Sequence, residues 1–257
     1  MTPSSQPTAP ERYTPGPARH AADFMAARTL ESHGRFALPW LKTGMRVLDL
    51  GCGPGTITLG LAQTAFPGTV TGLDADETAI RRAQQLAEGL EAVNASFRTG
   101  SAYRLPFADE TFDFVFSHAL FEHLSRPLEA LAEIRRVLKP AGFAALCSPD
   151  WDKFEVAPWT EEIEAAAEAY RDLQTRNGGD TLAGSRLGDA LERSGFLLAH
   201  EEARSETYAE APPIAEYLAR QLETAGDLRA ARAWRRWAAE PHAVFHQAWI
   251  SAVGVKG

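Results

Sequence analysis

Two acidic residues and three glycines are the residues of this sequence whose types and spacing best suit the binding of a ligand. Asp49 precedes the alternating glycines Gly51, Gly53 and Gly55, and Asp74 follows about twenty residues beyond them. Glycine permits φ > 0 and lets a ligand approach the backbone without a Cβ in the way. A carboxylate at the second position can accept hydrogen bonds from both hydroxyls of a ribose. These residues predict a site for a ligand that contains a nucleoside.

The glycines need a strand before them and a helix after them. Residues 47–50 are an apolar run typical of a buried parallel strand, and residues 56–62 follow as the expected helix. The first turn of that helix would present unpaired N–H groups and the positive end of the helix dipole. Residues 69–74 form a second expected strand, which ends at Asp74. This much fits NAD and S-adenosylmethionine equally.

Further motifs occur in a fixed order between residues 47 and 143. They are VLDLGCGPGT, GLDAD, LPF, FDFVFSHALFEHL and RVLKPAGF. In these motifs the chain resembles the class I S-adenosylmethionine-dependent methyltransferases, in particular the ubiquinone/menaquinone C-methyltransferase-like group. The resemblance implies a doubly wound, seven-stranded, mostly parallel α/β sheet of Rossmann-like type, with S-adenosyl-L-methionine as cofactor. It implies methyl transfer as the reaction and names no substrate.

The resemblance also assigns roles to the residues of the first motif. Gly51, Cys52 and Gly53 would form the loop on which the methionine part of the cofactor lies. Asp49 would hold the cofactor ammonium through water. Asp74 would bind the ribose hydroxyls.

The adenine side of the expected site departs from the family pattern. Ala75 would flank the adenine, and Ser101 and Ala102 stand where the family usually has Asp-Ala. The family aspartate accepts a hydrogen bond from the adenine amino group. Ser101 is shorter and uncharged, so that contact depends on the geometry of this chain, whereas Ala102 can still donate its backbone N–H.

Two histidines follow the expected fourth strand, at the floor of the cleft. His118 and His123 are candidates for a catalytic base, because histidine titrates near neutral pH. The alternative is that His118 only borders the cofactor and His123 packs or caps a short helix. Tyr13, His20 and Arg28 are further candidates for contacts from the N-terminal segment, with a solvent-exposed role as the alternative.

Outside the core motifs the chain is expected to add an arm and two insertions. Residues 1–20 are proline-rich and are expected to be a mobile arm, and residues 21–257 to form a single domain. An amphipathic helix is expected over residues 21–38. Helical insertions are expected at about 151–180, after the fifth strand, and at about 211–240, before the last strand. Together they would roof the cofactor cleft.

Aromatic residues in the first insertion suggest a mainly apolar acceptor pocket. They are Trp151, Phe154, Trp159 and Tyr170, and the alternative is that they only pack the insertion against the sheet. Residues 228–237 combine four arginines with two tryptophans. This segment would either contact a membrane surface or an acidic partner, or pack its tryptophans inward and expose its arginines.

Composition sets broad limits. The chain has 257 residues and a net charge of −8, which disfavours a nucleic-acid substrate. It has no apolar stretch of the roughly 18 residues that a membrane span needs, and no secretory signal is recognised. Two cysteines, Cys52 and Cys147, suggest neither a metal site nor a disulfide framework, so a cytoplasmic location is expected. The oligomeric state is not specified.

We therefore expect a methyltransferase that acts on an O or C atom of a small, mostly apolar acceptor. The first alternative is a methyltransferase that acts on tRNA or protein, which would need an open groove in place of a roofed pocket. The second is a non-catalytic module that binds S-adenosylmethionine. A nicotinamide dehydrogenase is the third, and it leaves the motifs after Phe112 without a purpose.

Overall fold

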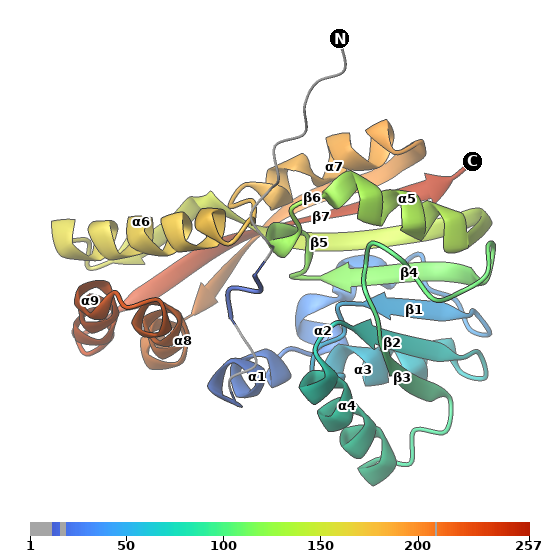
Figure 1. Ribbon diagram of the computed structural model, residues 1–257, viewed down its shortest axis with the longest axis horizontal. Coiled ribbons are helices and arrows are strands. Elements are labelled where there is room, and N and C mark those ends of the chain that lie inside the picture. The colour runs from blue at the N-terminus through green and yellow to red at the C-terminus, as the bar shows by residue number, and fades with distance from the viewer. Residues whose placement is uncertain (1–11, 16–18, 209) are drawn as a thin grey trace.

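A single seven-stranded sheet organises the computed structural model, which describes residues 12–15, 19–208 and 210–257 (Figure 1). The strand order is β3-β2-β1-β4-β5-β7-β6, with β7 antiparallel to both of its neighbours and the other pairs parallel. The expectation of a doubly wound, mostly parallel sheet is confirmed. The strands are β1 (Val47–Leu50), β2 (Val70–Asp74), β3 (Ala95–Thr99), β4 (Phe112–His118), β5 (Leu138–Ala157), β6 (Phe196–Tyr208) and β7 (Val244–Lys256).

Helices cover both faces of the sheet, which is why its central strands are apolar throughout. Leu48 and Leu50 of β1 pack in one core with side chains of α5 (Pro127–Val137) and α7 (Ala183–Arg193). Val47 lies in the core on the opposite face. The helices of that face are α2 (Leu30–His33), α3 (Thr56–Ala65) and α4 (Glu77–Gly89).

The strand order reverses between β1 and β4. β1 continues to β2 and then β3 on one side, whereas β4 pairs with the other side of β1. The loops that follow these two strands therefore diverge. In open α/β sheets, ligands bind in the crevice that forms at such a point.

A helical cap sits on the far ends of β5, β6 and β7, which extend well beyond the rest of the sheet (Figure 1). Trp151, Trp234 and Phe245 are buried in its core. The rings of Trp151 and Phe245 lie 6.1 Å apart between centroids, so the strands that reach the cap also contribute to its core. The cap helices are α6 (Glu161–Arg176), α8 (Ala211–Thr224) and α9 (Leu228–Ala238).

The arginine- and tryptophan-rich segment is α9, and it packs its tryptophans inward. Trp234 is fully buried, and its indole N–H donates to the backbone oxygen of Ala166 at 3.3 Å. Trp237 donates to the backbone oxygen of Pro158 at 3.1 Å. Arg235 lies outside and pairs with carboxylates of α8. The packing alternative for this segment is therefore the one that the structure shows.

The first insertion is not helical from its start. Residues 151–157 continue β5, and after an irregularity between Asp150 and Phe154 residues 154–157 pair with β7, with Phe154 opposite Gln247 and Val156 opposite Phe245. The helical expectation for residues 151–160 was wrong because these residues gain a partner strand that is distant in the sequence. The helix begins only after Pro158, where the Thr160 side chain caps α6 by accepting from the backbone N–H of Ile163 at 3.2 Å.

The single helix expected over residues 21–38 is also wrong. The segment forms α1 (Arg19–Ala26), α2 and a 3-10 turn, Arg35–Ala37. Thr29 interrupts it, because its backbone is extended and its hydroxyl accepts from the N–H of Ser32 at 3.1 Å. A residue that caps the start of a new helix has a non-helical backbone, so the preceding helix cannot continue through it.

The N-terminal arm is described only in part. Residues 1–11 and 16–18, on which most of the expected mobility falls, lie outside the described residues. In the segment 12–15 the backbone N–H of Arg12 donates to the backbone oxygen of Asn177 at 3.0 Å. The Asn177 side chain also bonds the Thr14 hydroxyl at 3.1 Å. This short segment, which we call the strap, is thus attached to the end of α6 and passes between the cap and the sheet (Figure 1).

Neither a membrane-spanning helix nor a metal-binding cluster occurs among the described residues. None of the helices in the described part of the chain has the length and apolarity to cross a membrane. Within those same residues, no group of three or more His, Cys, Asp or Glu side chains is arranged to hold a metal ion.

Candidate functional site

A cavity of about 590 Å³ opens at the point where the strand order reverses. Its walls come from the ends of β1, β2, β3 and β4 and from the strap. Ligand cavities for drug-sized molecules have volumes of about 300–1,000 Å³, so a nucleoside fits here. The described residues that line it are Arg12, Tyr13, Leu50, Gly51, Leu73, Asp74, Ala75, Asp76, Gly100, Ser101, Ala102, Tyr103, Ala119, Leu120, His123 and Leu124.

The glycine loop forms one edge of this cavity. Gly51 has φ 76°, and a Cβ there would lie 3.1–3.3 Å from side-chain atoms of Leu120, so glycine is required for both reasons. The loop is fixed to β2 because the N–H of Gly51 donates to the backbone oxygen of Leu73 at 2.8 Å. The N–H of Gly53 donates to Asp74 Oδ2 at 2.9 Å.

Asp74, the residue predicted to bind a ribose, lines this cavity. Its carboxylate lines the cavity, Oδ2 accepts from Gly53 and Oδ1 accepts from the N–H of Asp76 at 2.9 Å. Burial raises the pKa of Asp74, and these backbone donors oppose that rise. A carboxylate has about four acceptor sites, and the backbone N–H groups of Gly53, Ala75 and Asp76 occupy up to three of them, so at least one remains for a ligand hydroxyl.

The adenine side has no carboxylate at position 101. Ser101 is exposed and lines the cavity, and its Oγ accepts from the N–H of Tyr103 at 3.2 Å. The hydroxyl oxygen keeps one further acceptor site for an amino group. Ala75 and Ala102 line the same cavity and leave room for a flat ring.

Three of the residues predicted to bind cofactor are not among the residues that line this cavity. Asp49 is 2% exposed, and the Thr58 hydroxyl donates to its Oδ2 at 2.6 Å. Burial raises the pKa of Asp49 to about 7. Cys52 packs in a core with Phe97, and neither it nor Gly53 is among the lining residues.

His118 lies on the other face of the sheet from this cavity and is not among the residues that line it. Its ring stacks on Trp249 with 4.6 Å between centroids and meets His33 edge-on at 5.2 Å. Burial lowers the pKa of His118 well below its ordinary value, and the charge of Arg28 adds to that effect. The imidazole is therefore held neutral.

A second, smaller cavity of about 50 Å³ lies under the cap and adjoins the first. Tyr13, Ala119 and His123 line both cavities and form the wall between them. Ala119 has φ 57°, a conformation that non-glycine residues rarely adopt and that often marks a functional position. The other described lining residues are Phe24, Met25, Arg28, Glu122, Pro149, Trp151, Tyr170, Gln174, Tyr208, Ile214, Tyr217, Leu218, Phe245, Gln247 and Trp249.

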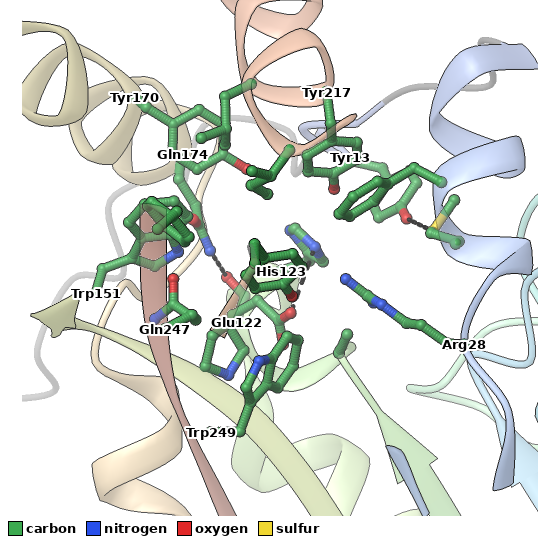
Figure 2. Close-up of a pocket in the computed structure, with 18 residues that line it drawn as sticks. Tyr13, Arg28, Glu122, His123, Trp151, Tyr170, Gln174, Tyr217, Gln247 and Trp249 are labelled. Atoms are coloured by element: carbon green, nitrogen blue, oxygen red, sulfur yellow. Dashed lines mark hydrogen bonds and ion pairs between the residues drawn. The ribbon is translucent and has the colours of Figure 1, made fainter. Parts of the chain in front are cut away.

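Three polar groups converge in this aromatic surrounding (Figure 2). The Glu122 carboxylate, the His123 ring and the Arg28 guanidinium point toward one another across the small cavity. Glu122 Oε1 lies 3.8 Å from His123 Nε2, and Oε2 accepts from the Ser148 hydroxyl at 2.8 Å. Burial raises the pKa of Glu122 to about 7, although the Ser148 hydrogen bond opposes that rise.

Arg28 and Tyr13 reach the small cavity from the N-terminal segment. The Arg28 guanidinium carbon lies 5.1 Å from the ring centroid of Trp249 and 5.6 Å from that of Phe24, within reach of cation–π attraction. The Tyr13 ring meets His123 edge-on at 4.9 Å, and its hydroxyl lies 3.3 Å from the sulfur of Met25. The strap thus closes the space above the two cavities.

The four aromatic residues of the first insertion divide into two groups. Trp151 and Tyr170 line the small cavity, as the pocket interpretation expects. Phe154 instead packs on Phe245 with 6.0 Å between centroids, and Trp159 is 60% exposed. Sequence reasoning missed Glu122, although a charged residue inside the apolar run that follows the fourth strand was an available signal.

Fold and cavities together define a Rossmann-like protein with a large cavity at the point where the strand order reverses and a second, capped cavity beside it. A family model described as a methyltransferase domain matches residues 41–205. The chain belongs to the S-adenosylmethionine-dependent methyltransferase family, whose cofactor is S-adenosylmethionine.

Individual relatives agree with this assignment. An uncharacterized methyltransferase of Schizosaccharomyces pombe is 36% identical over 62% of this chain and 59% of its own length. A demethylmenaquinone methyltransferase of Lactiplantibacillus plantarum is 41% identical over 39% of this chain and 43% of its own length. The chain spans about half the length of the curated relatives it matches.

The fold also matches solved structures. An S-adenosylmethionine-dependent methyltransferase of Aquifex aeolicus superposes with a TM-score of 0.55 at 19% identity, over 89% of this chain and 92% of the other. At that identity the similarity supports the fold alone.

Proposed function

We propose that this protein transfers a methyl group from S-adenosylmethionine to an O or C atom of a small, mostly apolar acceptor. The observation that carries the proposal is the wall shared by the two cavities. Tyr13, Ala119 and His123 border both, so a cofactor in the large cavity and an acceptor in the small one would meet there.

For the cofactor, each predicted residue receives a proposed role. Asp74 binds the ribose hydroxyls, and the backbone of Gly51 and Gly53 supports the methionine part. Asp49 lies beneath that loop and adds negative charge for the ammonium. Ala75 and Ala102 flank the adenine, with Ser101 as a weak acceptor for its amino group.

The residues of the site would act mainly by positioning. A bound sulfonium supplies an already activated methyl group. Holding two reactants in line can lower a barrier by about 7–11 kcal/mol. His123 is the predicted histidine that borders both cavities, whereas His118 is buried against Trp249 and would act only through its packing.

The cap favours a small acceptor over a macromolecule. The small cavity is enclosed by aromatic rings from β5, β7, α6 and α8. It is too small for an aromatic ring as it stands, because cavities that hold benzene have about 150 Å³. The acceptor would therefore enter as the strap or α1 shifts. The name of the Lactiplantibacillus relative, a demethylmenaquinone methyltransferase, also favours a small molecule.

Two measurements test the proposal. Calorimetry should show binding of S-adenosylhomocysteine and none of NAD. The protein, incubated with methyl-labelled S-adenosylmethionine and a fractionated cell extract, should label the small-molecule fraction. Label found only in RNA or protein would favour the macromolecular alternative, and cofactor binding without any transfer would favour the non-catalytic one.

The free thiols of Cys52 and Cys147 fit the proposed cytoplasmic location.

A further inference from the structure

We propose that Glu122 accepts a proton from the acceptor and that the acceptor is a weakly acidic hydroxyl compound, a phenol or an enol, methylated on oxygen. This inference rests on the proposed methyl transfer and narrows it to one substrate class. It also makes Glu122, which the sequence analysis did not single out, a catalytic residue.

The burial of Glu122 is the first observation. Its side chain is 4% exposed, and it accepts a hydrogen bond from the neutral hydroxyl of Ser148 at 2.8 Å. Buried carboxylates are costly unless they are paired or neutralised. A buried carboxylate at the wall of a cavity is placed to remove a proton from a molecule bound there.

The second observation is that Glu122 is held in place. Its backbone oxygen accepts from the Gln174 side chain at 2.9 Å and from the N–H of Asp180 at 2.9 Å. Both donors come from the end of α6 and the turn after it. A base held rigidly at a cavity wall requires little rearrangement during reaction.

The third observation is the charge around the carboxylate. Arg28 faces it from beyond α1, and His123 lies beside it on the same 3-10 turn (Figure 2). An oxyanion formed between Glu122 and Arg28 would be attracted by the guanidinium, whereas a cationic acceptor would be repelled. The other titratable groups that interact with Glu122 are the neutral side chains Tyr13 of the strap, Tyr170 of α6, Tyr217 of α8 and Cys147 of β5.

The protonation equilibrium fits a phenol better than an aliphatic alcohol. Burial raises the pKa of Glu122 to about 7, so the group can both accept and release a proton near neutral pH. A phenol has a pKa of about 10. Proton transfer from it to Glu122 is uphill by about 3 pKa units, and the nearby guanidinium reduces that difference. An aliphatic alcohol is a far weaker acid.

The step balances as follows in atoms and charge. The acceptor O–H bond breaks, and its proton goes to a Glu122 oxygen. The electron pair left on the acceptor oxygen forms the new O–C bond to the methyl group, and the methyl carbon–sulfur bond breaks with its electrons on sulfur. The neutral thioether and the methyl ether leave, and Glu122 returns its proton to water.

The test uses two phenols that differ in acidity. Phenol needs a base at neutral pH, whereas 4-nitrophenol, a much stronger acid, is already ionised at about pH 9. With phenol at about pH 7, Glu122→Gln should reduce kcat/KM by about 10²–10⁴-fold. With 4-nitrophenol at about pH 9 the same variant should lose less than about tenfold. The exposed residue Glu88 supplies the matched control, Glu88→Gln, which should match the wild type.

Each of the other possible results would contradict one part of the proposal: the role of Glu122, the substrate class or the proposed function itself. Equal losses with both phenols would make Glu122 structural. An acidity-dependent loss in His123→Gln, but not in Glu122→Gln, would make His123 the base. If the wild type labels small molecules from an extract but methylates neither phenol, the substrate class is wrong and the proposed function stands. If nothing is labelled, the proposed function itself fails.

Folding of the variants needs its own readout. S-adenosylhomocysteine affinity should stay within about threefold of wild type in Glu122→Gln, because Glu122 is absent from the large cavity. If that variant does not fold, Glu122→Asp retains the carboxylate. It should keep the rise of rate with pH near 7 while lowering kcat, and loss of that rise would overturn the proposal.

Discussion

Asp74 ties the glycine loop to the second strand and still presents at least one free acceptor site to the large cavity. Asp74→Ala should weaken S-adenosylhomocysteine binding by about 10–100-fold, because hydrogen bonds to a charged group contribute about 1.5–3 kcal/mol. Calorimetry on the folded variant measures this. Asp172→Ala, an exposed change on α6, is the control. An unchanged affinity would remove the ribose role.

Ser101 occupies the position of a carboxylate in the family pattern. Ser101→Asp should leave S-adenosylhomocysteine binding equal or tighter, because a carboxylate is a stronger acceptor for the adenine amino group than a hydroxyl. The same calorimetry compares Ser101→Ala, which removes the acceptor. A large loss of affinity in Ser101→Asp would mean that the new charge is repelled by Asp74 or that adenine lies elsewhere.

The position of a residue along its strand explains which residues of the candidate site could be predicted from the sequence. Asp74, Ala75, Ser101 and Ala102 follow strand ends, where any residue meets the crevice. His118 ends β4 on the same face as Phe114 and Phe116, because side chains alternate along a strand, and so it lies under α2 beside His33.

The location of Glu122 in the small cavity could not be predicted from the sequence around it. Its place in the small cavity depends on the 3-10 turn Phe121–His123 and on α6, whose end fixes its backbone. Neither constraint is visible in the local sequence, because the partners are about fifty residues away.

Among the elements, the strap and the segment from the end of β5 through α6 are the ones expected to respond to ligand. The strap is attached to α6 through Asn177, and Tyr13 closes the wall between the cavities. Hydrogen exchange with S-adenosylhomocysteine should slow for residues 12–30 and 151–179, because gating segments come from the less stable parts of a fold. Equal protection with and without ligand would mean that the cleft is preformed.

The cap should depend strongly on one tryptophan of α9. Trp234 is 0% exposed and Trp159 is 60% exposed, so the two provide a matched pair. Trp234→Ala should lower the free energy of unfolding by about 3–5 kcal/mol, and Trp159→Ala by less than about 1 kcal/mol. Urea denaturation of both variants checks the difference. A similar cost for both would mean that the cap core is not packed as described.

Elements with a strong local pattern were predictable, and those with distant partners were not. The strands and helices between residues 47 and 143 follow apolar periodicity. The end of β5 required β7, which lies about ninety residues away. The break at Thr29 required recognition of a cap inside an otherwise helical pattern.

At the scale of the whole molecule, two buried carboxyls contribute to the way in which stability varies with pH. Asp49 and Glu122 both have a pKa raised to about 7 by burial. The native state then binds more protons than the unfolded chain between about pH 4 and pH 7, so the stability that these groups contribute is present below that range and is lost as pH rises through it. Each group accounts for roughly 3–4 kcal/mol at most.

Removal of one ionisable group tests this dependence. Asp49→Asn keeps an oxygen that can accept from Thr58 and cannot ionise. Its melting temperature should exceed that of the wild type at about pH 8, by about 2–4 °C per kcal/mol, and match it near pH 4. Thermal denaturation across pH measures the difference. A constant offset at every pH would mean that Asp49 does not titrate in this range.

The position of β7 has a consequence for how the protein is made. This strand comes last in the sequence but lies between β5 and β6, and it pairs with both along nearly its full length. Until it has been translated, β5 and β6 expose unpaired edges, and Trp151 lacks Phe245. During translation, the strands and helices around the large cavity can therefore assemble before β7 is available, whereas the cap cannot. Chaperone demand should fall once the β7 segment has left the exit tunnel and can pair with β5 and β6.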